Sequence, residues 1–285
     1  MDVQKILKEL DALYAAGDRE KTETFLTETV RKAEEEDDWQ TQIVLNNEMM
    51  GLYRELGQIR DAVRIFGRTK AIFDEKNMIG TVPYASTLQN AANAYRVGGF
   101  PAEAIKLFEE ALEIYKAYLD DGDFRIAGLY NNLSLLYLEQ GAAWKAKEYS
   151  EEALKIIEKL AGTEIEQATN HVNLANLYCQ TDDLATAKKH LDDAAALFAT
   201  EENEDPHYSS LLSAWGQVYI AEEKYAEAER SFRDARAEVS RYFGKNRAYA
   251  SITKNLALAL ERQGKLAEAK EQMELAEQVL KDLNA

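Results

Sequence analysis

The chain has 285 residues and a formal net charge of −17, with one cysteine, three prolines and fourteen glycines. A single cysteine excludes an internal disulfide framework and fits a reducing compartment, and the negative charge disfavours nucleic acid and anionic membrane surfaces as partners. Because no apolar run approaches the roughly eighteen residues of a membrane span and the charged amino terminus lacks a secretion signal, we expect a cytoplasmic protein.

Residues 1–37 are expected to form a degenerate helical hairpin that caps one end of the fold. Ile6, Leu10 and Tyr14 recur at helical spacing, and Gly17 interrupts this stripe before Phe25 begins a second one. A terminal hairpin has a neighbour on one side only, which explains why its pattern is less regular.

Six clearer hairpins follow over residues 38–283. The first helices are expected near 38–56, 80–98, 123–140, 163–181, 205–222 and 246–263, and the second helices near 59–76, 101–119, 143–160, 184–200, 225–242 and 266–283. Glycine ends a first helix in four of these hairpins, because it adopts the left-handed conformation of a helix C-cap without strain. The last helix is predicted to close the stack.

A repeat of about 42 residues underlies these hairpins. We call the position of Tyr137 the anchor; the anchors are Tyr53, Tyr95, Tyr137, Tyr178, Tyr219 and Leu260. Alanine stands nine residues after every anchor and sixteen residues after five of the six. A small side chain lets the two helices of a hairpin approach closely, so we expect both alanine columns to be buried.

This frame of tyrosine, glycine and two alanines resembles the tetratricopeptide repeat. The long period and the run Asn131, Asn132 and Leu133 resemble the repeats of kinesin light chains and their bacterial relatives. The resemblance implies an all-α solenoid of about seven stacked antiparallel hairpins in a right-handed superhelix, here one domain over residues 1–285. It also implies that the first helices line a groove that binds peptides.

A ladder of amides follows the expected groove. The helical wheel places the positions seven, four and three before each anchor on the buried stripe, and the positions five and two before it on the opposite, solvent face. The candidate groove residues on that face, with two arginines that follow their anchors, are Asn90, Asn93, Asn132, Asn173, Asn176, Gln217, Asn255, Arg54 and Arg96.

Two explanations of the ladder remain open at this stage. Asparagine is a mediocre helix former, and its amide can pair with the backbone of an extended peptide whatever the peptide's side chains are. The alternative is that each asparagine bridges to the adjacent helix or merely retains the consensus of the repeat family. The carboxylate clamp of chaperone-binding relatives is not expected, because Leu135 and Glu139 occupy its basic positions in the third copy.

No constellation for catalysis, metal or cofactor is evident. The histidines are His171, His190 and His207, and none stands at metal-ligand spacing from another histidine or from Cys179. Cys179 follows His171 by eight residues, about 12 Å along a helix, which is too far for a nucleophile and its base.

We therefore expect a non-catalytic scaffold that binds an extended peptide or a partner's segment, with no catalytic residues, no metal and no cofactor. The alternative is a sensor that responds to a short signalling peptide and acts through a separate effector protein. Both hypotheses require a protein or peptide partner. The sequence does not decide whether the chain associates with itself through the end hairpins.

Overall fold

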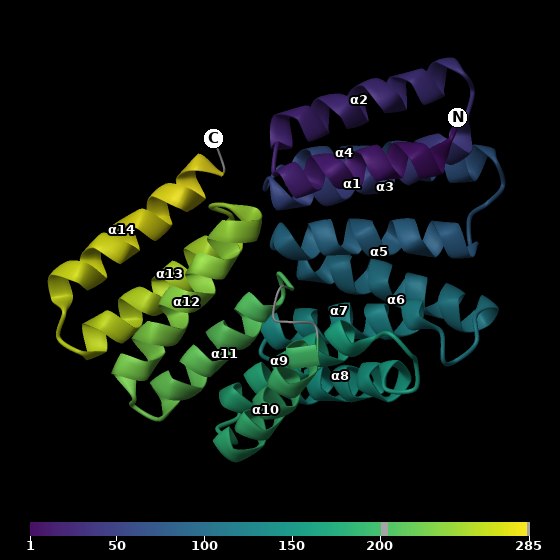
Figure 1. Ribbon diagram of the computed structural model, residues 1–285. Coiled ribbons are helices and arrows are strands. Elements are labelled where there is room, and N and C mark those ends of the chain that lie inside the picture. Colours follow the sequence, from purple (N-terminus) through teal and green to yellow (C-terminus); the bar gives the residue numbers. More distant parts are fainter. Residues whose placement is uncertain (201–204, 284–285) are drawn as a thin grey trace. The chain divides into compact units, whose positions relative to one another are not determined.

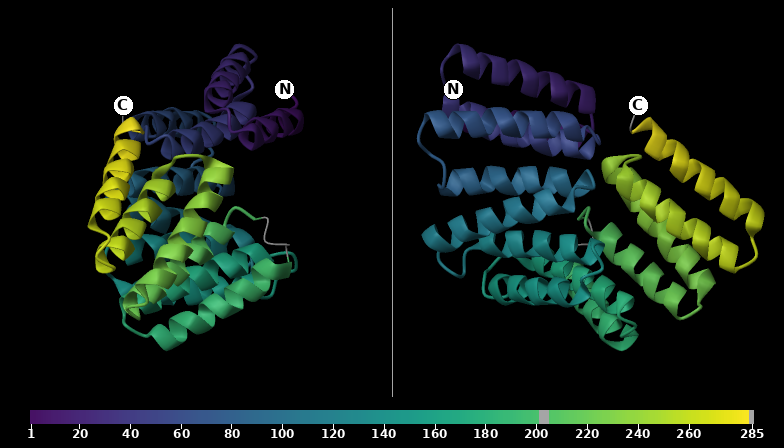
Figure 2. Two further views of the ribbon diagram at one scale, coloured as in Figure 1. Left: turned by 60° about the vertical axis from the view of Figure 1, so that its left-hand side comes forward. Right: turned by 180° about the vertical axis from the view of Figure 1, so that it is seen from behind.

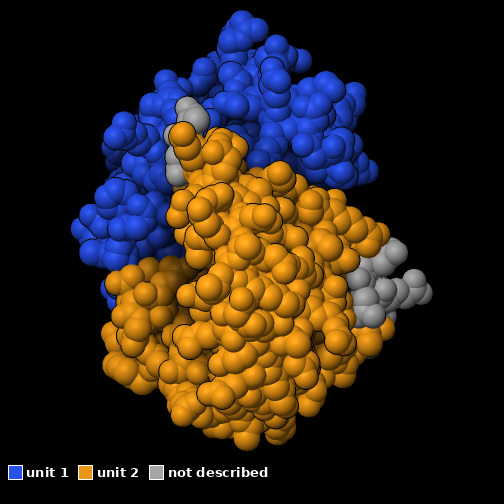
Figure 3. Space-filling view, turned by 90° about the vertical axis from the view of Figure 1, so that its left-hand side faces the viewer, with its two compact units in different colours: residues 1–119 blue, residues 120–285 orange. Residues whose placement is uncertain are grey.

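The computed structural model describes residues 1–200 and 205–283, and this part of the chain contains fourteen α-helices and no strand (Figure 1). The chain divides into two compact units, residues 1–119 and 120–285, which Figure 3 colours separately. That the hairpins form one continuous solenoid over residues 1–285 stays a prediction.

Unit 1 contains three hairpins, in which each helix packs on the next (Figure 2). Its helices are α1 (Val3–Ala16), α2 (Arg19–Glu35), α3 (Trp39–Glu55), α4 (Ile59–Glu75), α5 (Val82–Val97) and α6 (Pro101–Tyr118). The first helices α3 and α5 also contact one another directly.

Unit 2 contains the other four hairpins. Its helices are α7 (Phe124–Glu139), α8 (Ala143–Ile157), α9 (Glu164–Gln180), α10 (Leu184–Thr200), α11 (Tyr208–Ala221), α12 (Tyr225–Phe243), α13 (Arg247–Arg262) and α14 (Leu266–Asp282). The first helices α7, α9, α11 and α13 form a row in which each contacts the next. The prediction of an all-α fold built from seven helical hairpins is confirmed.

The turns between paired helices have the expected backbone conformation. Gly57, Gly99 and Gly141 have φ values of +75°, +79° and +72°, in the left-handed region that glycine adopts without strain. In the two hairpins without this glycine, Asp182 and Glu223 take the position with φ values of 62° and 59°. The geometry of the turn is therefore kept although its residue changes.

Both alanine columns are buried, as predicted. The alanines nine residues after the anchors are at most 8% exposed, and those sixteen residues after are at most 1% exposed. Thr69, which replaces alanine in the first full repeat, is also buried, and its hydroxyl donates to the carbonyl of Ile65 one turn earlier at 2.9 Å. Small side chains at these positions let the paired helices pack closely.

Replacing Ala146 by leucine is therefore expected to lower the free energy of unfolding by about 1–3 kcal/mol, because three more carbons must enter a filled interface. Ala146 is 0% exposed, and its carbonyl accepts a hydrogen bond from Ser134 of α7 at 2.8 Å. Urea unfolding followed by helicity measures the loss, with Ala161→Leu at an exposed site as the control. Equal stability of the two variants would contradict the packing argument.

The first helices are buried on more of their circumference than the sequence suggested. The predicted stripe is confirmed three and four residues before the anchors, where the only half-buried side chain is Trp215. Seven residues before the anchors it is confirmed in three copies, and the other three, Tyr130, His171 and Leu212, are half-buried. The positions one and eight residues before every anchor are buried as well. A first helix packs on its own partner and on neighbouring hairpins, so only a narrow strip of it remains accessible.

Within residues 1–200 and 205–283, no helix combines the length and the apolar character that a membrane span requires.

Candidate functional site

The first helices of unit 2 line a hollow of about 610 Å³. Its lining comes chiefly from α9, α11 and α13, and one residue each comes from α7 (Leu138) and α12 (Val239). On α11 the lining residues recur at helical spacing: Ser210, Ser213, Gln217 and Ile220. The hollow of unit 2 therefore forms where adjacent first helices pack side by side.

The lining of the unit 2 hollow mixes polar and apolar groups. Two predicted groove residues, Asn176 and Gln217, contribute their amides, and Ser209, Ser210, Ser213 and Ser251 contribute hydroxyls. Apolar surface is supplied by Leu138, Ala214, Ile220, Ala221, Val239, Ala248 and Ile252. Such a surface can both donate and accept hydrogen bonds, and it can also contact apolar side chains of a ligand.

The other predicted residues of unit 2 lie on the same helix row but outside the lining of the hollow. Asn132, Asn173 and Asn255 are each half-buried. The amide nitrogen of Asn173 donates to the side-chain oxygen of Asn131 at 2.8 Å, which joins α9 to α7. The hydrogen bond to Asn131 therefore supports the second explanation for Asn173, in which the asparagine bridges to the adjacent helix.

In unit 1, Asn90, Arg54 and Arg96 are half-buried, whereas Asn93 is only 7% exposed. The expectation that Asn93 lies on a solvent face is therefore wrong. Ala91, Ala92 and Ala94 beside it are buried as well, so α5 has no exposed side at this turn.

The two arginines distinguish unit 1 electrostatically from unit 2. Burial lowers the pKa of Arg54; Glu55 opposes this shift, and the positive charge of Arg96 adds to it. The side chains of Arg54 and Glu55 form an ion pair with a distance of 3.9 Å between Nη2 and Oε1. At the equivalent positions of unit 2, three uncharged residues line the hollow, Leu138, Cys179 and Ile220, and the fourth position holds the exposed Glu261.

Cys179 lines the hollow as a thiol. Burial raises its pKa to about 11, so the reactive thiolate is scarce at neutral pH. This supports the expectation that Cys179 is not a nucleophile.

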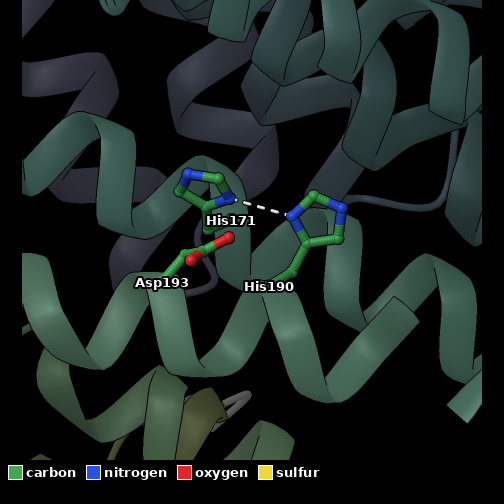
Figure 4. A group of neighbouring side chains, drawn as sticks. All are labelled: His171, His190 and Asp193. Atoms are coloured by element: carbon green, nitrogen blue, oxygen red, sulfur yellow. Dashed lines mark hydrogen bonds between the residues drawn. The ribbon is translucent and has the colours of Figure 1, made fainter. Parts of the chain in front are cut away.

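A second cluster was not evident from spacing along the chain. His171 of α9 and His190 of α10 face each other with 2.9 Å between their Nδ1 atoms, although nineteen residues separate them. Asp193 lies one turn after His190, and one ligand atom from each of the three residues lies within 4.8 Å of the others (Figure 4). The repeat contained a usable signal: these histidines stand seven residues before and twelve after the anchor Tyr178.

Comparison with known proteins identifies the repeat. The family model described as tetratricopeptide repeat matches residues 84–159, 166–237 and 207–282. KINESIN LIGHT CHAIN-RELATED 1 of Arabidopsis thaliana is 25% identical over 176 residues, which cover 61% of this chain and 29% of that protein. KINESIN LIGHT CHAIN-RELATED 2 of the same plant is 26% identical over 181 residues, covering 62% and 27% of the respective chains. The chain thus spans less than a third of these relatives' length.

Three solved structures share the fold. The apo form of RapI has a TM-score of 0.73 at 14% identity, covering 100% of this chain and 99% of that chain. NprR in complex with its cognate peptide NprX has a TM-score of 0.72 at 18% identity, covering 98% and 78%. BtubC (BKLC) from P. vanneervenii has a TM-score of 0.53 at 21% identity, covering 81% and 92%. These structures and the two plant relatives confirm the resemblance to kinesin light chains and bacterial repeat proteins.

Proposed function

The chain belongs to the tetratricopeptide repeat family, and we propose that it is a non-catalytic scaffold whose first helices bind an extended peptide or partner segment. The observation that carries this proposal is the unit 2 hollow, in which Asn176 and Gln217 stand among serines and apolar side chains. Its volume of about 610 Å³ lies in the range of roughly 300–1,000 Å³ occupied by small-ligand sites, so it suits a few residues of a peptide.

The chemistry of the lining favours an uncharged, extended segment. Amides and hydroxyls can pair with the N–H and C=O groups of a peptide backbone, which an extended chain leaves unpaired. The apolar wall beside them suits small or medium apolar side chains. Among the described residues, no Lys, Arg, Asp or Glu side chain lines the hollow, so the peptide's own charges are expected to lie outside it.

The test uses peptides selected against the full-length chain from a displayed library of unstructured dodecapeptides. We expect the combined Asn176→Ala and Gln217→Ala variant to bind a selected peptide about 10- to 100-fold more weakly, since two hydrogen bonds of about 0.5–1.5 kcal/mol each are lost. Titration calorimetry measures the dissociation constants. Gln278→Ala on α14 is the matched control, because its amide is exposed and lies outside the hollow.

Two results would overturn this assignment. One is equal affinity of the wild type and the folded double variant for every selected peptide. The other is an equal loss in the Gln278→Ala control. A photoreactive side chain placed at Ser213 provides an independent readout, because only a peptide in the hollow should crosslink there.

The second candidate function is a sensor that changes shape when it binds a short peptide. It is supported by the structural likeness to NprR, which was solved with its cognate peptide, over 98% of this chain. Solution scattering with and without a selected peptide separates the two functions. A sensor should change its radius of gyration on binding, whereas a rigid scaffold should keep it.

A further inference from the structure

The histidine cluster lies within one hairpin of unit 2. His171 projects from α9, and His190 and Asp193 project from the same face of α10, three residues apart. Figure 4 shows one carboxylate oxygen of Asp193 pointing toward the gap between the imidazole rings. Three side chains from two helices thus converge on one point.

We propose that His171, His190 and Asp193 form a binding site for a divalent transition-metal ion, and that Zn²⁺ fits it best. Two imidazole nitrogens and a carboxylate are a donor set that zinc accepts, and they leave at least one coordination position for water or a partner's side chain. Hard cations such as Mg²⁺ and Ca²⁺ prefer oxygen ligands only, so two histidines disfavour them. This site is independent of the proposed peptide groove.

The distance between the nitrogens is compatible with coordination after a small adjustment. An ion about 2.05 Å from both Nδ1 atoms, which lie 2.9 Å apart, would see them at an angle of about 90°. This is the angle between neighbouring ligands of an octahedral ion. A tetrahedral ion requires a separation of about 3.4 Å, which rotation of the half-buried His171 ring can supply.

The environment favours the neutral form of both rings, which metal ligation requires. Burial lowers the pKa of His171, and the nearby His190 ring lowers it further. Burial also lowers the pKa of His190, and Asp193 partly opposes this shift. Protons therefore compete with a metal less than they would at an ordinary histidine. The charged groups that act on the pair are Asp193, Glu151, Lys147 and Lys189.

The orientation of His190 is fixed by the anchor tyrosine. The rings of Tyr178 and His190 are stacked, with centroids 5.5 Å apart and planes 14° from parallel. This stacking leaves the Nδ1 atom directed at His171, which lowers the entropy lost when a metal orders the ligands.

The preceding hairpin, α7 and α8, has tyrosines in place of the two histidines. Tyr130 and Tyr149 occupy the places of His171 and His190, with ring centroids 5.7 Å apart against 5.2 Å for the histidines. Tyr149 likewise stacks on its anchor, Tyr137. An aromatic pair therefore suffices to fill this space, and the tyrosines supply a matched substitution that removes the imidazole ligands.

The experiment titrates Zn²⁺ into the untagged, chelator-treated full chain and into the combined His171→Tyr and His190→Tyr variant, after helicity shows that both are folded. We expect one Zn²⁺ per wild-type chain and at least about 100-fold weaker binding to the variant, because loss of an outer-shell partner alone costs about 10–100-fold. Asp193→Asn should weaken binding by about 10-fold or more. Zn²⁺ should raise the melting temperature of the wild type only.

Two further readouts separate coordination from nonspecific binding. Co²⁺, used as a spectroscopic probe, should give a visible absorption band that the tyrosine variant lacks. Zinc affinity should fall as the pH drops below the histidine pKa values, because protonated imidazole cannot ligate. Equal zinc binding by wild type and tyrosine variant would overturn the proposal, as would no binding by the wild type, which would leave a hydrogen-bonded histidine pair only.

Discussion

Replacing Phe232 by alanine is expected to lower the free energy of unfolding by about 3–5 kcal/mol, because a cavity forms where a large ring was buried. The ring is 0% exposed and belongs to a core cluster with Ala235, Val239 and Leu256, from α12 and α13. Urea unfolding followed by helicity measures the change in its midpoint. Phe243→Ala at the end of α12 is the control, since that side chain is 45% exposed.

Gly216 of α11 lies against the Phe232 ring and provides a sharper test of how that ring is packed. A Cβ atom added there would lie 2.5 Å from the Phe232 ring, so Gly216→Ala should cost about 1–3 kcal/mol in the wild type. In the Phe232→Ala background the clash disappears, and alanine should then stabilise α11 by up to about 1 kcal/mol. Additive effects of the two substitutions would contradict this direct contact.

Replacing Tyr137 by alanine is expected to lower the free energy of unfolding by about 3 kcal/mol, because the ring packs between its own hairpin's helices. Tyr137 is 7% exposed, its ring stacks on Tyr149 with centroids 5.6 Å apart, and Lys145 Nζ lies 4.6 Å from its centroid. Thermal and urea unfolding of the two proteins measure the loss.

Tyr137→Phe separates the ring from its hydroxyl. The phenylalanine variant keeps the stacking and loses only the hydrogen bond that Lys145 Nζ donates to the hydroxyl at 3.4 Å, so it should cost at most about 1 kcal/mol. If Tyr137→Phe were as unstable as Tyr137→Ala, the hydroxyl and not the packed ring would be the important group.

The prediction of helices from the sequence succeeded because the same residue pattern recurs in six hairpins, and each hairpin packs its two helices in the same way. The first helix expected near residues 123–140 is α7, Phe124–Glu139, and the second helix expected near 225–242 is α12, Tyr225–Phe243. The alanine columns succeeded for the same reason, since close approach of two paired helices demands a small residue at a fixed distance from each turn.

The candidate site was less accessible to prediction. Periodicity identifies which side of a helix faces its own partner, but the neighbouring hairpins bury a second side, as at Asn93. The lateral contact between Asn173 and Asn131 likewise depends on how α7 and α9 align. Of the predicted ladder, Asn176 and Gln217 line the hollow because α9, α11 and α13 enclose it there.

The sequence by itself determined the helical hairpins, their turns and the small residues between paired helices, because these follow from local propensity and a regular spacing. The tertiary structure alone decided which side chains from different helices meet. Closing one hairpin brought His171 within 2.9 Å of His190, and stacking several hairpins created the hollow around Gln217. Both depend on contacts between residues far apart in the chain, which spacing along one helix does not encode.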